Sequence, residues 1–330
     1  MKSFHAMRRA TLALAAASAL AATFASQAQE AGWPTKPVKM VVAWSPGGAT
    51  DILARLVSTE LGKHLGQQVV VDNRPGAGGT IGHGQVAKSP ADGYTLVLAT
   101  NSTYAIAEHL YKGLPYQHQR DLVPVSGLAA SPLILVARQS LPVKNVAELI
   151  DYARKNPGKL NIASGGNGST SHLASELLMS LTQTQMTHVP YKGGGPATTA
   201  VAAGEADVAF LDLGVAVPFV TSGRIRGVGV SGASRSALVP DVPAIAESGV
   251  PRFESTTNFA LFAPAGTPRA IVDRLYAAVR ASLAEPELQA KLRRQGVESV
   301  GSSPEELARN VAAESALWAR IIRERNIVLE

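Results

Sequence analysis

Short apolar runs alternate with amphipathic segments along most of the chain. The first run, VKMVVAW at 38–44, precedes a segment that starts at Thr50 or Asp51 and carries leucine and valine at helical spacing. Gly66 stands where that helix should end. A β-branched run followed by a helical segment is typical of a βαβ unit. The pattern therefore predicts an α/β fold with a largely parallel sheet.

The same order of strand and then helix recurs in both halves of the chain, at 68–88, 93–111, 159–181, 186–204 and 206–223. Extended chain is predicted between and after these units, at 121–138, 224–231 and 257–268. Two strong helices are predicted at 267–283 and 303–325, and this terminal pair can return to the first half. We therefore predict two α/β lobes with more than one chain crossing between them.

The two halves share a weak internal similarity at an offset of 120 positions. The five identities pair Ala43, Gly48, Thr50, Leu53 and Ala54 with Ala163, Gly168, Thr170, Leu173 and Ala174. The similarity suggests that two similar sites lie in two halves. Shared loop-to-helix sequence preferences are the alternative explanation.

The first 28 residues have the order of a secretory signal. The basic residues Lys2, Arg8 and Arg9 precede a short Ala/Leu-rich run, and Ser26-Gln27-Ala28 suits cleavage after Ala28. We expect a cleaved signal peptide over 1–28, with a buried N-terminal helix as the alternative. Without the three basic residues the formal net charge falls from +6 to +3, so much of the apparent basicity belongs to the export signal.

Composition narrows the classes of function. The remaining Lys and Arg residues are scattered, without a basic run interleaved with aromatic residues, so no nucleic-acid partner is expected. The chain has no cysteine, which excludes disulfides, thiolate metal sites and a thiol nucleophile. After the signal, no apolar run approaches the roughly 20 residues that cross a bilayer. We expect a protein that is free in the periplasm, with full secretion as the alternative.

Four glycine-rich stretches follow predicted strands, at 45–51, 74–82, 165–170 and 192–195. In open α/β sheets, ligands bind at the carboxyl ends of strands, where helices begin. A helix N-terminus offers unpaired N–H donors and partial positive charge, and glycine lets the backbone approach an anion closely. Hydroxyl donors are added by Thr50, Ser164, Ser169 and Thr170. The loops are therefore predicted to bind an oxyanion, with ordinary turn and cap chemistry as the alternative for each.

Enzyme and metal chemistry has little support in the sequence. GAGGTIG at 76–82 has its third glycine one place later than a dinucleotide fingerprint needs, and neither a Gly-x-Ser-x-Gly elbow nor a P-loop lysine is present. The mature histidines have no i, i+4 pairing that would indicate a metal site. An exported hydrolase would have to use Ser169 with His172. We predict no enzyme activity, no cofactor and no metal.

Three side chains near the loops have more than one interpretation. His172 can reach a ligand or order its own loop. Asp51 is a helix-cap candidate that contacts an amine or orders the loop, because a carboxylate aimed at an anionic ligand would repel it. Asp212 follows a predicted strand and is a candidate partner for the amino or hydroxyl group of a solute.

Eight motifs occur in a characteristic order: PGGATDILAR, VVVDNRPGAGGTIG, SPADGYTLVLAT, LPY followed by RDLVPV, SGGNGSTSHLASEL, HVPYKGGGPA, VPDVPAIAESGVP and LFAPAGTP. Together they cover nearly the whole mature chain, which resembles the Bug family of periplasmic solute receptors, the substrate-binding class of tripartite tricarboxylate transporters. One departure is Trp44, where most relatives are expected to carry a smaller or different apolar residue. Its indole either narrows or walls the pocket, or it packs under the loop.

The resemblance implies a two-lobed Venus-flytrap receptor with mainly parallel sheets and a cleft between the lobes. Lobe 1 would comprise 29–128 and 254–330, and lobe 2 would comprise 129–253, joined by crossing strands. The ligand's carboxylate would lie between one strand-to-helix loop from each lobe, bound by backbone amides, small hydroxyls and ordered water. The predicted ligand-binding residues are Ser45, Pro46, Gly47, Gly48, Ala49, Thr50, Asp51, Gly78, Gly79, Thr80, Asn101, Ser164, Gly165, Asn167, Gly168, Ser169, His172, Tyr191, Lys192, Gly193, Gly194 and Asp212.

The implied function is capture of a small carboxylate, such as a dicarboxylate or an amino acid, and its presentation to the membrane permease subunits of a tripartite tricarboxylate transporter. A sensor kinase is the alternative partner, and a monomer is expected. A structural or adhesive protein would not need four glycine-lined loops at one cleft. The identity and charge of the solute stay open at this point.

Overall fold

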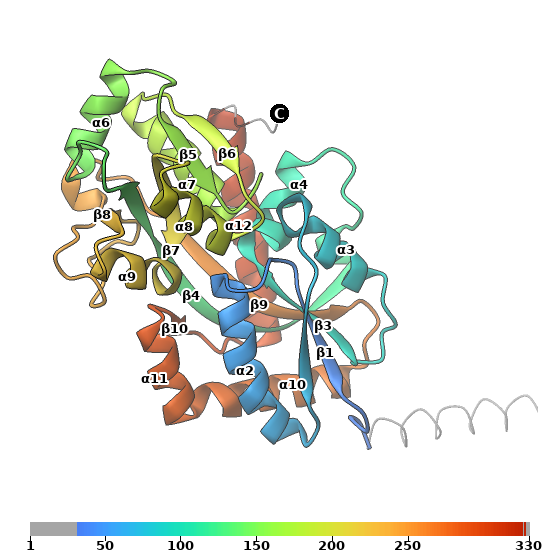
Figure 1. The fold of residues 1–330 in the computed structure, drawn as a ribbon. Helices are drawn as coiled ribbons and strands as arrows, with labels where there is room; N and C mark the ends of the chain where they lie inside the picture. The colour runs from blue at the N-terminus through green and yellow to red at the C-terminus, as the bar shows by residue number, and fades with distance from the viewer. Residues whose placement is uncertain (1–31, 326, 328–330) are drawn as a thin grey trace, which may run out of the picture.

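The computed structural model describes residues 32–325 and 327, and the predicted signal peptide lies outside the described residues. Two α/β lobes are visible in Figure 1, one at the upper left and one at the lower right. Most of the predicted apolar runs form strands. The strands are β1 (Val38–Val42), β2 (Val69–Asn73), β3 (Thr95–Thr100), β4 (Leu122–Arg138), β5 (Asn161–Ser164), β6 (Thr187–Pro190), β7 (Val208–Asp212), β8 (Ile225–Val230), β9 (Thr256–Pro264) and β10 (Glu298–Ser299).

The helices follow the strands as the periodicity predicts, with short additions. They are α2 (Ala49–Leu65), α3 (Thr80–Ala87), α4 (Ala107–Leu110), α5 (His118–Asp121), α6 (Val146–Lys155), α7 (Thr170–Thr182), α8 (Gly194–Ala203), α9 (Leu213–Thr221), α10 (Arg269–Ala284), α11 (Pro286–Arg294) and α12 (Pro304–Arg325), with the 3-10 turns η1 (Ala77–Gly79) and η3 (Ala246–Ser248). Gly66 ends α2 in the left-handed conformation, as predicted. The segment after β3 differs from a plain helix because it begins with a π-helical turn, η2 (Ser102–Ile106).

Each lobe contains three parallel strands, and two long strands connect the lobes. The strand order is β2-β1-β3-β9-β4-β7-β5-β6, in which β2-β1-β3 belongs to lobe 1 and β7-β5-β6 to lobe 2. The first part of β4 pairs with β9, and its last part pairs with β7 and β8, all antiparallel. Register shifts interrupt the β4–β9 ladder between Pro124 and Ser126 and between Gly127 and Ala129. The ladder between the crossing strands is therefore irregular over residues 124–129 of β4.

Both faces of each sheet are buried. In lobe 1, Met40 and Leu96 belong to one apolar cluster, while their neighbours Val41 and Val97 belong to another on the opposite face. Clusters on the two faces of lobe 2 are built in the same way around β4, β5 and β7. Burial on both faces explains why these strands appear in the sequence as continuous apolar runs.

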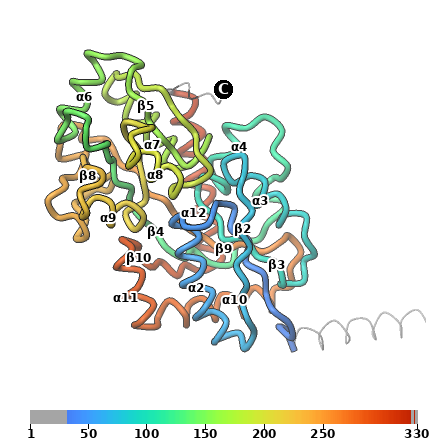
Figure 2. The backbone as a smooth tube through the Cα atoms, in the orientation of Figure 1, coloured from blue at the N-terminus to red at the C-terminus, as the bar shows by residue number. Residues whose placement is uncertain are grey.

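The C-terminal part of the chain returns to lobe 1. In Figures 1 and 2 the orange and red α10 and α11 lie next to the blue α2, and Leu275 and Val279 of α10 share a core cluster with Leu53 and Leu61 of α2. The helix α12 packs against η2, β4 and α4. Near its end, Trp318 and Ile322 join Ile106 of lobe 1 and Leu173 of lobe 2 in one cluster. Hence α12 contacts both lobes, while the predicted lobe boundaries stay a prediction.

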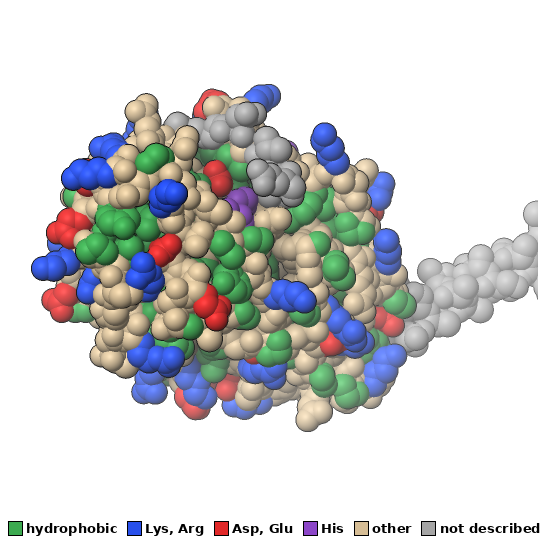
Figure 3. Space-filling model, turned by 45° about the horizontal axis from the view of Figure 1, so that its top comes forward, with side chains coloured by type: hydrophobic (Ala, Val, Ile, Leu, Met, Phe, Trp, Pro, Cys, Tyr) green, Lys and Arg blue, Asp and Glu red, His purple; other side chains and the backbone are tan. Residues whose placement is uncertain are grey.

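On the face shown in Figure 3, blue Lys and Arg side chains are interspersed with red Asp and Glu side chains. Within the described part of the chain, no helix is both long enough and apolar enough to cross a membrane.

Candidate functional site

A small cavity lies where loops of the two lobes meet, and we call it the cleft cavity. Its volume is about 50 Å³, which is room for a group of a few heavy atoms. It lies at the carboxyl ends of parallel strands, the usual ligand position in open α/β sheets. The residues that line it are Trp44, Gly48, Ala49, Thr50, Thr100, Leu133, Gly165, Ser169, Thr170, Ser171, Gly194, Phe210, Leu211, Asp212 and Thr257.

The start of α2 contributes backbone donors from lobe 1. Gly48 is the N-cap residue and makes no side-chain cap hydrogen bond. The amides of Ala49 and Thr50 belong to the first turn, whose N–H groups have no partner within a helix. Both residues line the cleft cavity. This end of α2 therefore presents N–H donors and the positive end of the helix dipole to the cavity.

Asp51 orders the loop that precedes α2. Its carboxylate accepts hydrogen bonds from the Gly47 amide (3.0 Å) and the Asn73 side chain (3.0 Å), and it forms an ion pair with Arg55 (2.9 Å). Burial alone would raise the pKa of Asp51, but hydrogen bonds from Arg55, Gly47 and Asn73 outweigh it, so that the pKa lies below the usual value. Of the interpretations offered by the sequence, the structure shows loop ordering.

The start of α7 contributes donors from lobe 2. Ser169 is the N-cap residue, and its Oγ accepts a hydrogen bond from the His172 amide at 3.2 Å. The next two residues, Thr170 and Ser171, lie in the first turn and line the cleft cavity. The Gly165 amide donates to Ser171 Oγ at 2.9 Å, which fixes the approach of the loop. Two helix N-termini from opposite lobes therefore face one cavity.

His172 orders this second loop. Its Nδ1 accepts a hydrogen bond from the Gly168 amide (3.1 Å), and its Nε2 lies 3.5 Å from Glu176. The ring stacks on His188 with centroids 3.9 Å apart, and burial followed by repulsion from His172 lowers the pKa of His188 to about 3. Both ring nitrogens of His172 thus have partners other than the Ser169 hydroxyl. The geometry favours a loop-ordering role over a nucleophile and base pair.

Glycines bring the loops of the two lobes into direct contact. A Cβ on Gly78, which has φ +62°, would lie 2.2 Å from the Asn167 carbonyl oxygen across the cleft. The Tyr111 hydroxyl donates to that same oxygen at 2.5 Å. A Cβ on Gly195 would lie 3.6 Å from the backbone of Gly47. Since backbone meets backbone here, the loops of the two lobes are in contact, and a side chain at Gly78 would clash with that contact.

Asn101 connects the lobes behind the cavity. Its Oδ1 accepts a hydrogen bond from Thr170 Oγ1 (3.0 Å), and its Nδ2 donates to the Thr256 carbonyl (3.0 Å) and to Glu314 (3.3 Å). Asn101 is buried and is not among the described residues that line the cleft cavity. Contact between Asn101 and a ligand stays a prediction, while its structural partners are clear.

Asp212 is the N-cap residue of α9 and lines the cleft cavity. Its Oδ1 is buried and has no hydrogen-bond partner within the described part of the chain. Burial raises the pKa of Asp212 to about 6, against weaker opposing effects of the Thr257 side chain and the backbone amide of Asp212. The Nε1 of Trp44, another lining residue, is also buried without a described partner. Two residues that line the cavity thus each have one buried polar atom without a described partner, an acceptor on Asp212 and a donor on Trp44.

The predicted site residues divide into two sets. Seven of them line the cleft cavity: Gly48, Ala49, Thr50, Gly165, Ser169, Gly194 and Asp212. Others lie in or behind the same loops without lining it: Ser45, Pro46, Gly47, Asp51, Gly78, Gly79, Thr80, Asn101, Ser164, Asn167, Gly168, His172, Tyr191, Lys192 and Gly193. Ligand contact stays a prediction for both sets.

The predicted ligand-binding residues omit eight lining residues, although the sequence indicated Thr170 as a hydroxyl donor and Trp44 as a candidate pocket wall. They are Trp44, Thr100, Leu133, Thr170, Ser171, Phe210, Leu211 and Thr257. Thr100 and Leu211 stand at or near the ends of predicted strands, so the strand-end rule would have included them. Leu133 and Thr257 come from the crossing strands, whose position beside the cavity depends on how the lobes are joined. Among the described lining residues there is no Lys, Arg or His, so the donors in the wall are neutral.

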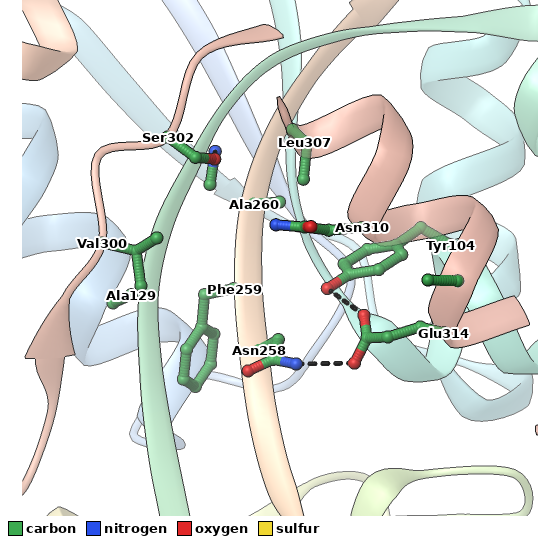
Figure 4. Close-up of a pocket in the computed structure, with 12 residues that line it drawn as sticks. Tyr104, Ala129, Asn258, Phe259, Ala260, Val300, Ser302, Leu307, Asn310 and Glu314 are labelled. Carbon is green, nitrogen blue, oxygen red and sulfur yellow. Dashed lines mark hydrogen bonds between the residues drawn. The ribbon is translucent and has the colours of Figure 1, made fainter. Parts of the chain in front are cut away.

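A second cavity of about 320 Å³ lies between α12 and the segment that contains β10, and we call it the α12 cavity. Figure 4 shows Glu314 pointing toward Tyr104 and Asn258 in this cavity. The carboxylate of Glu314 accepts hydrogen bonds from Asn258 Nδ2 (2.6 Å), Tyr104 Oη (3.0 Å) and Asn101 Nδ2 (3.3 Å). Its acceptors are therefore used within the fold. No cluster of His, Cys, Asp and Glu among residues 32–325 and 327 could hold a metal ion.

Comparison with known proteins gives a consistent result. The family model described as "Tripartite tricarboxylate transporter family receptor" matches residues 53–327. A "UPF0065 protein in tcbD-tcbE intergenic region" from Pseudomonas sp. (strain P51) is 40% identical, and the match covers 88% of this chain and 87% of the relative.

Solved structures with a similar fold include proteins with bound organic acids. "R. palustris Rpa4515 with adipate" is 40% identical with a TM-score of 0.87, over 90% of this chain and 99% of that one. "MatC (Rpa3494) from Rhodopseudomonas palustris with bound malate" is 34% identical with a TM-score of 0.85, over 88% and 100%. "Periplasmic binding protein BugD" is 32% identical with a TM-score of 0.87, over 90% and 100%. The chain thus has the two-lobed fold of periplasmic binding proteins.

Proposed function

Since the chain belongs to the tripartite tricarboxylate transporter receptor family, we propose that it is a periplasmic receptor that captures a small organic acid in the cleft cavity. The predicted signal peptide supports export, and the family supports delivery to membrane permease subunits. The related proteins with adipate and malate support a carboxylate as the ligand. In this function the protein binds and releases its ligand without chemical change.

The observation that carries the proposal is the meeting of two helix N-termini from opposite lobes. The first turns of α2 and α7 both line the cleft cavity, with Ala49 and Thr50 on one side and Thr170 and Ser171 on the other. Each offers unpaired N–H groups and a partial positive charge. A carboxylate between them would accept hydrogen bonds from both lobes, which is the usual way that helix N-termini bind anions.

Binding of this kind couples the ligand to closure. When the lobes separate, only one of the two helix N-termini can contact the carboxylate. A ligand that bridges them therefore stabilises the closed form over the open form. The direct contacts between the loops, such as Gly78 with Asn167, supply part of the closed interface. A permease could thus distinguish the liganded receptor by its shape.

A thermal-shift screen tests the proposal. The mature chain from residue 29 is refolded to remove any co-purified solute and is then melted with mono-, di- and tricarboxylates, amino acids and the neutral amide of each acid. At one hundred times its dissociation constant, a ligand adds about 2.7 kcal/mol to the free energy of unfolding, a shift of a few degrees. We expect an acid to raise the melting temperature and its amide to leave it unchanged. Stabilisation by amides alone would contradict the proposed carboxylate site.

A further inference from the structure

We infer that Asp212 selects the ligand, and that the bound acid carries a hydrogen-bond donor, an ammonium or hydroxyl group, on the carbon next to its carboxylate. This inference rests on the proposed function and specifies its ligand class. Its basis is a buried acceptor without a partner, carried by a residue that lines the same small cavity as the two helix N-termini.

The Asp212 carboxylate has unused hydrogen-bonding capacity within the described residues. Its Oδ1 is buried without a hydrogen-bond partner, and a Cβ on Gly194 would lie 3.6 Å from its Oδ2. A buried acceptor without a partner is costly, so such groups in native proteins call for a specific explanation. Because Asp212 lines the cleft cavity, a ligand donor can supply the missing hydrogen bond.

The size of the cavity fixes where this donor lies on the ligand. The first turns of α2 and α7 and the Asp212 carboxyl all border a space of about 50 Å³. A carboxylate and the carbon next to it, with its substituent, are about as many heavy atoms as such a space holds. The donor that reaches Asp212 therefore belongs to that carbon and not to the distant end of a longer acid.

The charge balance of the cavity points the same way. The wall is formed by α2, α7, α8, β3, β4, β7 and β9 and by the loops after β1 and β5, and Asp212 is the single titratable residue among the described lining residues. No lining cation neutralises either Asp212 or a ligand carboxylate. An ammonium group would neutralise Asp212 directly, and a hydroxyl group would donate to it without charge.

The alternative is a proton shared between Asp212 and a ligand carboxylate. With a pKa of about 6, Asp212 is mostly ionised at neutral pH, where an unsubstituted dianion would meet it as a like charge. The two alternatives give opposite pH dependences. A donor ligand prefers ionised Asp212 and binds more tightly as the pH rises through 6, whereas a shared proton favours binding at low pH.

The test is isothermal titration with matched acids that differ at one carbon. Succinate, malate and aspartate form one set, and propionate, lactate and alanine form another. The titrations use the wild type, Asp212→Asn, Asp212→Ser and the control Asp241→Asn, which makes the same change at an exposed residue. Circular dichroism and melting of each ligand-free variant verify that it is folded.

In the wild type we expect the 2-hydroxy or 2-amino acid to bind at least tenfold more tightly than the unsubstituted acid in at least one set. Comparison of the hydroxy acid with the amino acid in each set identifies whether the donor is a hydroxyl or an ammonium group. Between pH 5 and pH 7 the affinity of the donor-bearing acid should rise about tenfold, the change expected for one group that ionises near pH 6. Asp212→Asn and Asp212→Ser should remove this pH dependence and weaken the preference, since Asn and Ser still accept a hydrogen bond but carry no negative charge, while Asp241→Asn should keep both.

Three results would overturn the inference. Equal binding of substituted and unsubstituted acids would show that Asp212 does not select a donor, while the proposed receptor function would stand. Tighter binding at low pH that depends on Asp212 would establish the shared proton instead. If neither these acids nor any acid of the thermal-shift panel binds, the proposed function itself fails, and the inference with it.

Discussion

Two buried carboxylates, Asp212 in the cleft cavity and Glu314 in the α12 cavity, differ in how their hydrogen-bonding capacity is used. Burial raises the pKa of both. Glu314 accepts hydrogen bonds from Asn258, Tyr104 and Asn101, whereas Asp212 Oδ1 has no partner in the described part of the chain. Burial is common to both, so the difference lies in their hydrogen-bond partners. A carboxylate whose oxygens accept hydrogen bonds from the fold stabilises the fold, whereas one with an unused acceptor can bind a ligand.

The two cavities also differ in how they are built. The cleft cavity is formed by loops of both lobes and exists as described only while these loops are in contact. The α12 cavity is formed over the crossing strands β4 and β9 and beside α12. Asn101 connects the two, since it bonds Thr170 on one side and Glu314 on the other. Substitutions in either cavity, or at the Asn101 hydrogen bonds between them, therefore test this difference.

Removal of Glu314 should have the largest effect. Glu314→Leu leaves the buried donors of Tyr104, Asn258 and Asn101 without their acceptor, and one unpaired buried donor costs about 1–3 kcal/mol. We expect a loss of about 4 kcal/mol in the free energy of unfolding, measured by urea denaturation at pH 7. Asp212→Asn is the matched control and should not lower stability. Equal losses in both variants would refute the distinction between the two carboxylates.

Closure of the cleft cavity should be the next most sensitive feature. Gly78→Ala places a Cβ against the Asn167 carbonyl oxygen at a backbone angle that favours glycine. We expect the loops to separate and the affinity for the stabilising acid to fall about a hundredfold, a loss of about 3 kcal/mol. Titration calorimetry measures the affinity, and small-angle scattering measures the opening.

Gly47→Ala is the control for backbone strain in this experiment. Gly47 also has a positive φ, +81°, but a Cβ there meets nothing within 4 Å. We expect a smaller loss for Gly47→Ala than for Gly78→Ala. If the two variants lose the same affinity, backbone strain explains the effect and the contact with Asn167 does not.

The pH dependence of stability should report the unpartnered state of Asp212. The folded protein keeps a proton on Asp212 up to a pKa of about 6, compared with 3.8 for the ordinary group. Between these values the folded state binds more protons than the unfolded state, so stability falls as the pH rises. Two pKa units correspond to roughly 3 kcal/mol at most.

The measurement for Asp212 is ligand-free unfolding at a series of pH values from 4 to 7. The difference in stability between the wild type and Asp212→Asn should decline across this range by that amount. A constant difference would show that Asp212 has an ordinary pKa and that its carboxylate is solvated or paired in the ligand-free protein.

The bridge between the two cavities should give the smallest effect. Thr170→Val removes the hydroxyl that donates to Asn101 across the lobes, and one such hydrogen bond contributes about 1 kcal/mol. We expect about a fivefold loss of ligand affinity, measured by calorimetry. Thr199→Val, on the exposed side of α8, is the control and should bind normally. Unchanged affinity in Thr170→Val would mean that Asn101 does not couple the lobes.

Much of the architecture follows from sequence because it depends on local patterns. The apolar runs of β1 and β3 alternate between two buried faces, and Gly66 ends α2 as its position predicts. The π-helical turn η2 carries no local signal that distinguishes it from an ordinary helix. It packs against α12, which lies about two hundred residues later in the chain.

The site is predictable only in part for the same reason. Strand-end glycines located the loops, and the hydrogen bonds of Asp51 and His172 then resolved alternatives that the sequence left open. The partners of Asn101 come from α7, β9 and α12. Leu133 and Thr257 enter the cavity wall through the crossing strands. These positions depend on contacts between segments that are far apart in the chain, and residue spacing does not predict such contacts.

Because β9, α10 and α11 return to lobe 1, this lobe can be completed only after the C-terminal part of the chain is available. Translation delivers the chain from its N-terminus, and β5, β6, β7 and β8 all precede β9. The centre of lobe 1 must wait, because β3 pairs with β9 and α2 packs on α10. The half that emerges first is therefore completed last, and until then its apolar strands lack part of the packing that protects them from aggregation.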